Sequence, residues 1–501
     1  MAISKLNFPP GIKRDGTVFD GEISPNGEWV RWRMGRPRKI LGWRELNAPF
    51  TGPVRGTAIY STTGQSEVFG CSSTSVESVY LFNNGGTSGI NDRTPVGLSP
   101  NDNYVWQSAV LYDSVSTGAV ILLHPGANLQ DIDNAETSTV YIGSLGTGSA
   151  LTAITGTDVS GGCAVFGQYG IYYGSDGHFI ASVANNPNDI TNTGSLDANI
   201  CGDKIVKGLP VRAGGSAPAG ILWSLSNVIR ASFVGGTPIW SFDTVTSFSS
   251  IMSSSGVVEY DGQFFWVGAD RFFNYNGVVR DLPNDYNQDY FFNNVNPLYR
   301  QKVFGIAIPR YGEIWWFYPH GDSVECNNAI VLNVKSGFWF DLNVNAPGAL
   351  RTSGLRPTSG FPYPLLFSAV PDSGNKYYLC QHEFGVDRID INNNVLAVNS
   401  FVETPDISLP AAASKDLQTR LERMEPDFVM NGEMTMTVTG NDYAQAPSYS
   451  SEPFPFNGDT KRLDPRQQRR ELRLLLQSNQ VGGYYEMGQV LVELEEGDAR
   501  Q

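Results

Sequence analysis

The side chains that most often carry chemistry are few and widely separated in this chain. Each of the four histidines, His124, His178, His320 and His382, lies more than fifty residues from the next. None of them forms the HExxH spacing of a metal site. We therefore expect each histidine to be a surface or turn residue rather than a ligand. The five cysteines include no CxxC pair, a distribution that predicts free thiols from a reducing compartment.

Carboxylates give no clearer catalytic pattern. Residues 174–177, Gly-Ser-Asp-Gly, are similar to part of the sialidase Asp-box SxDxGxxW, but the required spacing and the Trp are absent, so they predict a hairpin turn. Glycoside hydrolysis needs two carboxylates that meet in space, and the candidates are Glu313, Asp176 and Asp261. No GxSxG, P-loop or GxGxxG motif occurs. The sequence therefore predicts a protein that is not an enzyme and that has no catalytic residue, metal or cofactor.

The first 48 residues combine aromatic and basic side chains. Three tryptophans alternate with a cluster of cations: Trp29, Trp32 and Trp43 with Arg31, Arg33, Arg36, Arg38 and Lys39. One interpretation is an arm that clamps nucleic acid. The other, which we prefer, is a strand with Val30, Trp32 and Met34 on one face and Trp29, Arg31 and Arg33 on the other. Gly35, Pro37 and Gly42 punctuate it as turns, and the arginines pair with acidic neighbours.

Residues 258–282 predict the elements of the central region. The Asp261-Gly262 and Asn276-Gly277 pairs supply the positive φ angles of tight hairpins. Aromatic strands over 264–267 and 272–275 lie between these turns. Such a meander of short antiparallel strands is typical of a β-propeller blade.

Similar units recur between residues 49 and 400. Aromatic or branched runs followed by turns occur at 79–95, 170–183, 271–283 and 376–390, and 313–323 and 329–342 resemble further hairpin halves. At about 40–50 residues per blade, this region predicts roughly six to eight blades. A jelly roll or a large sandwich is the structural alternative.

The pattern changes near residue 401, where Pro405, Pro410 and the small residues 411–414 predict a domain boundary. Alternation of Met and Val with Thr over 434–439, and of leucines over 472–476, then predicts strands. We expect an all-β chain with three parts: 1–48, a basic and aromatic arm with the first strands; 49–400, the propeller body; and 401–501, a C-terminal β-sandwich-like domain.

The charge is distributed unevenly. The net charge is −15, with +4 on residues 1–48, −12 on 49–400 and −7 on 401–501. A protein that binds nucleic acid usually has a basic surface, so an acidic chain is not a conventional nucleic-acid binder. Acidic residues could instead line a channel through which DNA passes without binding, because like charges repel. Charged residues make up only 17% of the chain, and this low fraction predicts that the protein forms part of a larger assembly. The N-terminus predicts no signal peptide, and the longest aliphatic run, 120–123, is too short to span a bilayer.

Several long segments resemble one protein family. They are GIKRDGTVFDGE with WVRWRMGRPRKILGWRE near the N-terminus, VVEYDGQFFWVGADRFFNYNGVVRDLP, NQDYFFNNVN and EIWWFYP in the middle, and RMEPDFVMNGEMTMTVTGNDYAQAP with YYEMGQVLVELEEGDAR at the end. They are similar to the tail nozzle proteins of short-tailed bacteriophages, also described as packaged-DNA stabilisation or tail-hub proteins. The region 100–165 contributes little to the resemblance.

This resemblance implies a non-enzymatic virion protein of the phage tail, made in the host bacterial cytoplasm. A propeller with an accessory β-domain would form a homohexameric ring at the end of the portal–adaptor channel. The ring would extend the DNA conduit, retain the genome and release it. The implied partners are the head–tail adaptor, tail fibres or tail spikes, and double-stranded DNA that passes without sequence-specific binding. Six copies would carry a charge of −90, six times −15, which repels DNA.

Within this interpretation, residues 1–48 and the C-terminal β-domain are expected to make the intersubunit and adaptor contacts. The specific candidates are Arg31, Arg33, Arg36, Arg38 and Trp32. Two alternatives remain. One is a carbohydrate-binding or glycan-cleaving propeller for host-receptor recognition, in which Trp315 and Trp316 stack on sugar rings. Core packing within a blade is the preferred interpretation of both, because the flanking residues Ile314 and Phe317 are also apolar. The other is a cellular propeller scaffold for peptides.

Overall fold

The structure is a computed structural model. It describes residues 2–17, 22–83, 85–126, 137–212, 217–344, 349–409, 417–443 and 446–499. Part of the N-terminal motif (18–21) and the boundary predicted at Pro410 and 411–414 therefore lie outside the described residues.

The chain is almost entirely β, as the sequence predicts. Over residues 258–282 the expected meander is present as β22 (Val258–Tyr260), β23 (Gln263–Val267), β24 (Phe272–Tyr275) and β25 (Val279–Leu282). Asp261 and Gly262 have φ angles of 51° and 75°, which the turn between β22 and β23 requires. Phe265, Val267 and Phe272 are buried on one side of this sheet, because alternate residues of a strand share a face.

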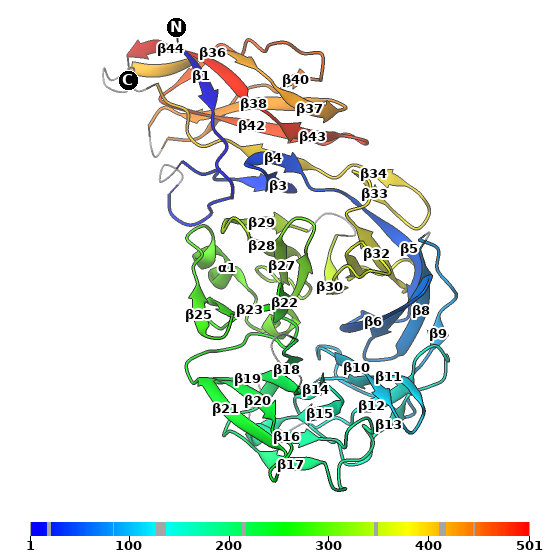
Figure 1. Cartoon of the computed structure of the whole chain (residues 1–501). Coiled ribbons are helices and arrows are strands. Elements are labelled where there is room, and N and C mark those ends of the chain that lie inside the picture. The colour runs from blue at the N-terminus through cyan, green and yellow to red at the C-terminus, as the bar shows by residue number, and fades with distance from the viewer. Residues whose placement is uncertain are drawn as a thin grey trace.

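Six four-stranded antiparallel meanders of this kind and a seventh, larger sheet follow one another around a ring (Figure 1). The first strand of each blade, in chain order, is β6 (Gly56–Thr62), β10 (Gln107–Asp113), β14 (Gly162–Phe166), β18 (Ile205–Pro210), β22, β26 (Phe304–Ile308) and β30 (Arg351–Leu355). The remaining strands of the first four blades are β7 (Gln65–Cys71), β8 (Val76–Phe82), β9 (Asn91–Asp92), β11 (Gly118–His124), β12 (Tyr141–Ser144), β13 (Thr152–Ala153), β15 (Tyr169–Tyr173), β16 (His178–Ala181), β17 (Leu196–Asn199), β19 (Ala219–Ser224), β20 (Val228–Phe233) and β21 (Trp240–Thr246). After β26 the sixth blade continues with β27 (Glu313–Tyr318), β28 (Asn328–Asn333) and β29 (Trp339–Asn343). The helix α1 (Gln288–Asn294) precedes β26 in the chain.

The first strands of the blades lie innermost, and most of them contact the first strand of the next blade, including β30 of the last blade against β6 of the first. The predicted propeller is therefore confirmed, with seven blades among the described residues.

The ring is closed by a strand from near the start of the chain. The seventh blade contains β30, β31 (Leu365–Ser368) and β32 (Tyr377–His382), and its outermost strand is β5 (Trp43–Phe50). In this pairing Phe50 lies opposite Tyr377 and Trp43 opposite His382. Two short strands, β33 (Arg388–Ile389) and β34 (Val395–Leu396), extend the same sheet beyond β5.

The second body is a β-sandwich-like terminal domain built from both ends of the chain. Its N-terminal strands are β1 (Ala2–Leu6), β2 (Gly27–Glu28), β3 (Val30–Arg33) and β4 (Arg36–Lys39). Its C-terminal strands are β35 (Ser400–Glu403), β36 (Leu417–Glu425), β37 (Phe428–Asn431), β38 (Met434–Asn441), β39 (Tyr449–Ser450), β40 (Phe454–Phe456), β41 (Gln467–Arg469), β42 (Glu471–Ser478), β43 (Tyr484–Met487) and β44 (Val490–Ala499).

The terminal strands form three sheets that mix the two chain ends: β1-β44-β36-β41, β2-β35-β42-β38 with β39 and β40, and β3-β4-β43-β37. Both termini therefore lie in this domain, at the end of the molecule away from most of the blades (Figure 1). The strands predicted over 434–439 and 472–476 are present as β38 and β42.

The two bodies share one hydrophobic core. A single cluster contains Leu474 and Met436 of the terminal domain together with Phe304 and Trp315 of the sixth blade. Trp32 of β3 joins them by packing against Phe338 and Phe340 near β29, with ring centroids 6.1 Å from each. Because buried apolar area is the main stabilising term, a shared core couples the two bodies energetically.

The N-terminal strand β3 and the turn that follows it depart from the predicted alternation of buried and exposed residues. Val30, Arg31 and Trp32 are all buried, whereas Met34 lies in the turn and is 91% exposed. Trp29 has a φ of 50°, so the chain turns immediately before β3 and the period of two is broken there. The assignment of Val30, Trp32 and Met34 to one face is therefore wrong.

Candidate functional site

The predicted contact residues lie on the β3–β4 hairpin, the part of the terminal domain that contacts the propeller. Arg33 pairs with Arg36 at the end of this hairpin, and the connecting residues are Met34 and Gly35. All four residues are exposed. We call residues 33–36 the basic tip.

Arg31 lies inside the chain rather than on its surface. Its guanidinium contacts Glu383 at 2.6 Å and Glu313 at 3.1 Å, and it lies 3.7 Å from the ring centre of Tyr311. Burial disfavours its charged form, but the charges of Glu313 and Glu383 outweigh burial and raise the pKa of Arg31. With an exposure of 1%, Arg31 cannot reach a partner in this conformation, so its assignment as a contact residue is corrected.

Trp32 and Arg38 are also buried, at 3% and 7% exposure. Arg38 lies 3.9 Å from Glu486 of the neighbouring strand β43. Of the five predicted contact residues, only Arg33 and Arg36 are therefore exposed. The prediction that the arginines pair with acidic neighbours describes Arg31 and Arg38.

The two tryptophans proposed to stack on sugars are core residues. Trp315 and Trp316 are 1% and 0% exposed. Their indole N–H groups donate to the Glu313 carboxylate at 2.9 Å and to the Gly256 carbonyl at 2.8 Å. Neither ring presents a face to solvent, so the stacking role assigned to them is corrected in favour of blade packing.

One of the concave features is a cavity of about 330 Å³ among the innermost strands of the propeller. Its walls come from β6, β10, β18, β22, β26 and β30 and from residues that directly precede or follow some of these strands. Three cations line it, Lys207, Arg212 and Arg356, and Glu259 is the one carboxylate among its described lining residues. We call this space the axial cavity.

Lys207 is placed in the axial cavity by an irregularity in β18. The pairing of β18 with β19 skips Val206, so that Ile205 lies opposite Ser224 and Lys207 opposite Trp223. Such a bulge redirects the following side chain. Among the described residues no hydrogen bond or ion pair engages the Lys207 ammonium. Burial lowers the pKa of Lys207 to about 8.

Gln107 ties the inner strands together beside the axial cavity. Its side-chain N–H groups donate to the carbonyls of Gly161 at 2.8 Å and Val206 at 2.9 Å. Its carbonyl oxygen accepts from the Tyr173 hydroxyl at 2.7 Å. A Cβ on Gly162 would lie 2.3 Å from this side chain, so glycine is needed there. One glutamine thus links the second, third and fourth blades.

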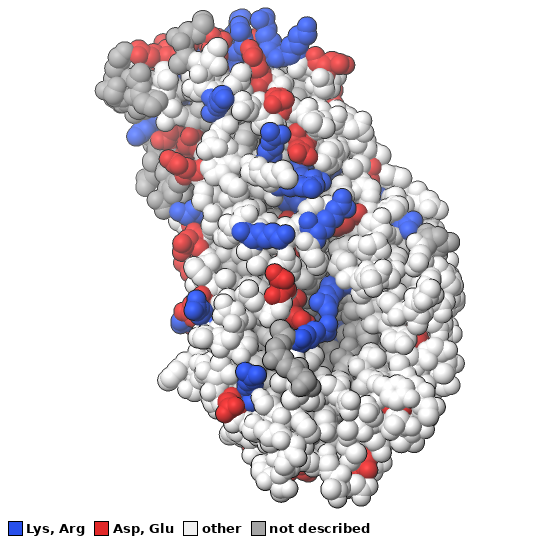
Figure 2. Space-filling view, in the orientation of Figure 1, with Lys and Arg blue, Asp and Glu red and all other residues white. Residues whose placement is uncertain are grey.

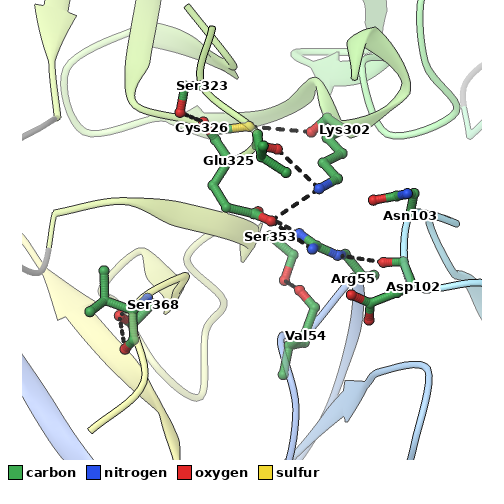
Figure 3. Close-up of polar contacts among 12 residues, drawn as sticks. Val54, Arg55, Asp102, Asn103, Lys302, Ser323, Glu325, Cys326, Ser353 and Ser368 are labelled. Atoms are coloured by element: carbon green, nitrogen blue, oxygen red, sulfur yellow. Dashed lines mark hydrogen bonds and ion pairs between the residues drawn. The ribbon is translucent and has the colours of Figure 1, made fainter. Parts of the chain in front are cut away.

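A second polar cluster joins the blades where the ring closes (Figure 3). Arg55 donates to both carboxylate oxygens of Glu325, at 2.5 and 2.7 Å, and to the carbonyl of Asp102 at 2.9 Å. The Lys302 ammonium donates to Glu325 at 3.0 Å. Burial alone would raise the pKa of Glu325, but its bonds to Arg55 and Lys302 lower it. These residues connect the first and sixth blades.

The three carboxylates considered for glycoside hydrolysis do not face one another across a cavity. Asp176 and Asp261 are exposed and have positive φ angles in turns, while Glu313 is engaged by Arg31 and Trp315. Within the described ranges no three His, Cys, Asp or Glu side chains come together as a metal site. No helix in the described part of the chain is both long and apolar enough to cross a membrane.

Two histidines contradict the prediction of surface or turn positions. His124 is 0% exposed; its Nε2 donates towards the carbonyls of Ser138 and Val159, and its Nδ1 accepts from the Gly126 N–H at 3.0 Å. His382 is 4% exposed and stacks on Trp43 with ring centroids 5.4 Å apart. Its Nε2 accepts from the Arg351 guanidinium at 2.9 Å.

The axial residues escaped the sequence analysis because no local motif marks them. Lys207 and Arg212 lie in and just after β18, whereas Arg356 follows β30, and the closed ring brings the three to one cavity.

Comparisons with known proteins add little. No family model matches the chain, and no curated protein matches it. Among solved structures, it is similar to an exo-β-1,3-galactanase from Phanerochaete chrysosporium, with 11% sequence identity and a TM-score of 0.27, over 90% of this chain and 100% of that one. At this TM-score the likeness carries no argument about function.

Proposed function

We propose that this chain is a structural virion protein that assembles with further copies of itself as a ring at the end of a portal–adaptor channel. In this role it extends the DNA conduit, holds the packaged genome and permits its release. The proposal begins from the similarity of the N-terminal, central and C-terminal segments to tail nozzle proteins. It is a proposal about assembly, so the residues that matter are those presented to other chains.

The observation that carries it is the basic tip. Arg33, Met34 and Arg36 are exposed, and Met and Arg are side chains enriched at protein interfaces. The base of the same hairpin is fixed by Arg31, which binds Glu313 of the sixth blade and Glu383 after the seventh. The tip is thereby presented in one orientation, and such preorganisation lowers the entropic cost of binding.

Charge supports a second copy of the chain, or the adaptor, as the partner of the basic tip. The propeller body, residues 49–400, has a net charge of −12. Figure 2 shows Lys and Arg side chains in a band down the middle of one face, whereas the blades at its right edge carry few charges. A positive tip against an acidic neighbouring body gives electrostatic complementarity.

The axial cavity lacks the arrangement that favours the glycan-cleaving alternative. Hydrolysis of a glycosidic bond uses two facing carboxylates. Glu259 stands without a second carboxylate among the described cavity residues, and it lies 3.4 Å from Arg212. The buried positions of Trp315 and Trp316 also leave that alternative without its stacking residues.

Electron cryo-microscopy of the purified chain mixed with its candidate portal–adaptor complex tests the proposal. We expect a ring of copies around the channel axis. Charge reversal in Arg33→Glu/Arg36→Glu should abolish ring formation while the far-UV and near-UV circular dichroism spectra stay unchanged. The matched control is Arg280→Glu, an exposed arginine on β25, which should assemble normally. A folded chain that stays off the adaptor as a monomer would refute the proposal.

A further inference from the structure

We propose that the axial cavity is a binding site for an anionic sugar, that is, a monosaccharide unit that carries a carboxylate or a phosphate. This site is separate from the basic tip, and the inference does not depend on the assembly proposed above. It rests on the size of the cavity, on its excess of cations, and on the hydrogen bonds that two hydroxyl groups of its wall donate within the chain.

The cavity has the dimensions of a small-molecule site. Its volume of about 330 Å³ lies at the lower end of the range for ligand pockets, which is roughly 300–1,000 Å³. Its wall includes an apolar patch, formed by Trp106, Leu209 and Ile306, beside the polar residues. A sugar ring presents apolar C–H faces and polar edges, and this mixture of wall residues suits both.

The charges of the wall select an anion. Lys207, Arg212 and Arg356 face one carboxylate, Glu259, so the described lining carries two more positive than negative charges. The Arg212–Glu259 pair is long, at 3.4 Å, and the Arg212 side chain is 60% exposed, so the pair is weak and leaves Arg212 able to bind a second anion. Lys207 is half-buried, without an ion partner in the described structure, and is aimed into the cavity by the bulge at Val206.

Two hydroxyl groups of the wall favour a ligand that donates hydrogen bonds. Ser108 donates its proton to the Thr57 carbonyl at 2.9 Å, and Ser353 donates to the Val54 carbonyl at 2.8 Å. Each of these oxygens therefore presents acceptor lone pairs rather than a free proton. The hydroxyl groups of a sugar are suitable donors, whereas a simple inorganic anion offers few or none. Cations and acceptors in one cavity together indicate an anionic polyol.

Titration calorimetry with four probes tests the proposal: glucuronate, glucose 6-phosphate, glucose and inorganic phosphate. We expect the two anionic sugars to bind at least tenfold more tightly than either glucose or phosphate. Equal binding of glucose would overturn the role of the cations, and equal binding of inorganic phosphate would overturn the role of the acceptors. If none of the four probes binds at 10 mM, a concentration on the order of the dissociation constant of a very weak site, the proposal as a whole would be overturned.

Two variants keep the test decisive if one fails to fold. Lys207→Gln removes the half-buried ammonium, and Arg356→Gln removes an exposed guanidinium at the same cavity. Each should weaken the binding of both anionic sugars by about tenfold, the loss of one charged contact. Arg280→Gln on β25, outside the cavity lining, is the matched control and should bind as the parent does. Unchanged binding in a folded Arg356→Gln or Lys207→Gln protein would overturn the site assignment.

Discussion

At the scale of single residues, the most consequential side chain is Arg31. Its two carboxylate partners lie 282 and 352 residues away in sequence. The sequence pattern predicted that arginines here pair with acidic neighbours, but it could not identify Glu313 and Glu383, because those contacts arise only when the ring has closed. For the same reason a residue expected on an interface lies in the interior. Whether a charged side chain is buried depends on partners that are distant in sequence. The spacing of residues within one segment therefore cannot predict its burial.

We predict that Arg31→Ala destabilises the protein by about 3–5 kcal/mol, because it leaves Glu313 and Glu383 buried without their cation. Urea unfolding followed by tryptophan fluorescence measures the change. The control is Arg33→Ala, two residues along the same strand but exposed, where a change within about 0.5 kcal/mol is expected. Similar losses in the two variants would contradict the role assigned to the buried ion pairs.

His124 makes stability depend on pH. Burial lowers its pKa to about 4, whereas an unfolded histidine has a pKa of about 6.5. Between these values the unfolded chain binds a proton that the folded chain does not, so the free energy of unfolding decreases as the pH falls from about 6.5 to 4. One pKa unit corresponds to about 1.4 kcal/mol, which gives a loss of about 3 kcal/mol by pH 4.

The measurement is the free energy of unfolding at pH 7 and at pH 4, in the parent and in His124→Asn. Carboxylates contribute to the acid dependence of both proteins, so the difference between their slopes isolates the histidine. We expect the parent to lose about 3 kcal/mol more than the variant. Parallel pH profiles would show that His124 is not the group responsible.

At the scale of elements, the sequence predicted the turns and many of the individual strands, because residues close together in the chain determine them. Turn residues such as Asp261 and Gly262 marked the hairpins, and the alternation over 434–439 marked β38. The pairing of β5 with β32 was not predicted, because register between strands so distant in sequence leaves no local signal. Trp29 misled the prediction of the first strands, since an aromatic residue with positive φ is uncommon and interrupts the alternation.

The closure of the ring by β5 can be tested at Phe50. This side chain is 0% exposed and packs edge-to-face on Phe367 of β31, with ring centroids 5.0 Å apart. Phe50→Ala should cost about 3–5 kcal/mol and should speed amide exchange in the seventh blade. The matched control is Phe248→Ala, whose side chain is 92% exposed and should matter by less than about 0.5 kcal/mol. Unchanged exchange in the seventh blade would argue that closure does not depend on this contact.

At the scale of the whole molecule, the propeller and the terminal domain are expected to unfold together. They share one hydrophobic cluster, and Arg14 of the N-terminal segment binds Asp341 of β29 at 2.9 and 3.0 Å. Scanning calorimetry of the parent should therefore give one transition whose calorimetric and van't Hoff enthalpies agree. In Arg31→Ala, which weakens the junction, the transition should separate into two. Two transitions in the parent would show that the bodies are energetically independent.

A strand near the start of the chain, β5, completes the last blade. During synthesis β5 must therefore wait until its partner strand has been made. Phe50 leaves the ribosome long before Tyr377, the residue that it lies opposite in the finished sheet. At synthesis rates of about 5–20 residues per second, β5 waits roughly 16–65 seconds for its partner. During that interval Trp43, Leu46 and Phe50, all buried in the finished fold, belong to a strand with an unpaired edge, the kind of segment on which aggregation begins. We therefore expect the yield of folded protein in a cell to depend on how well the nascent chain is shielded while it is being made.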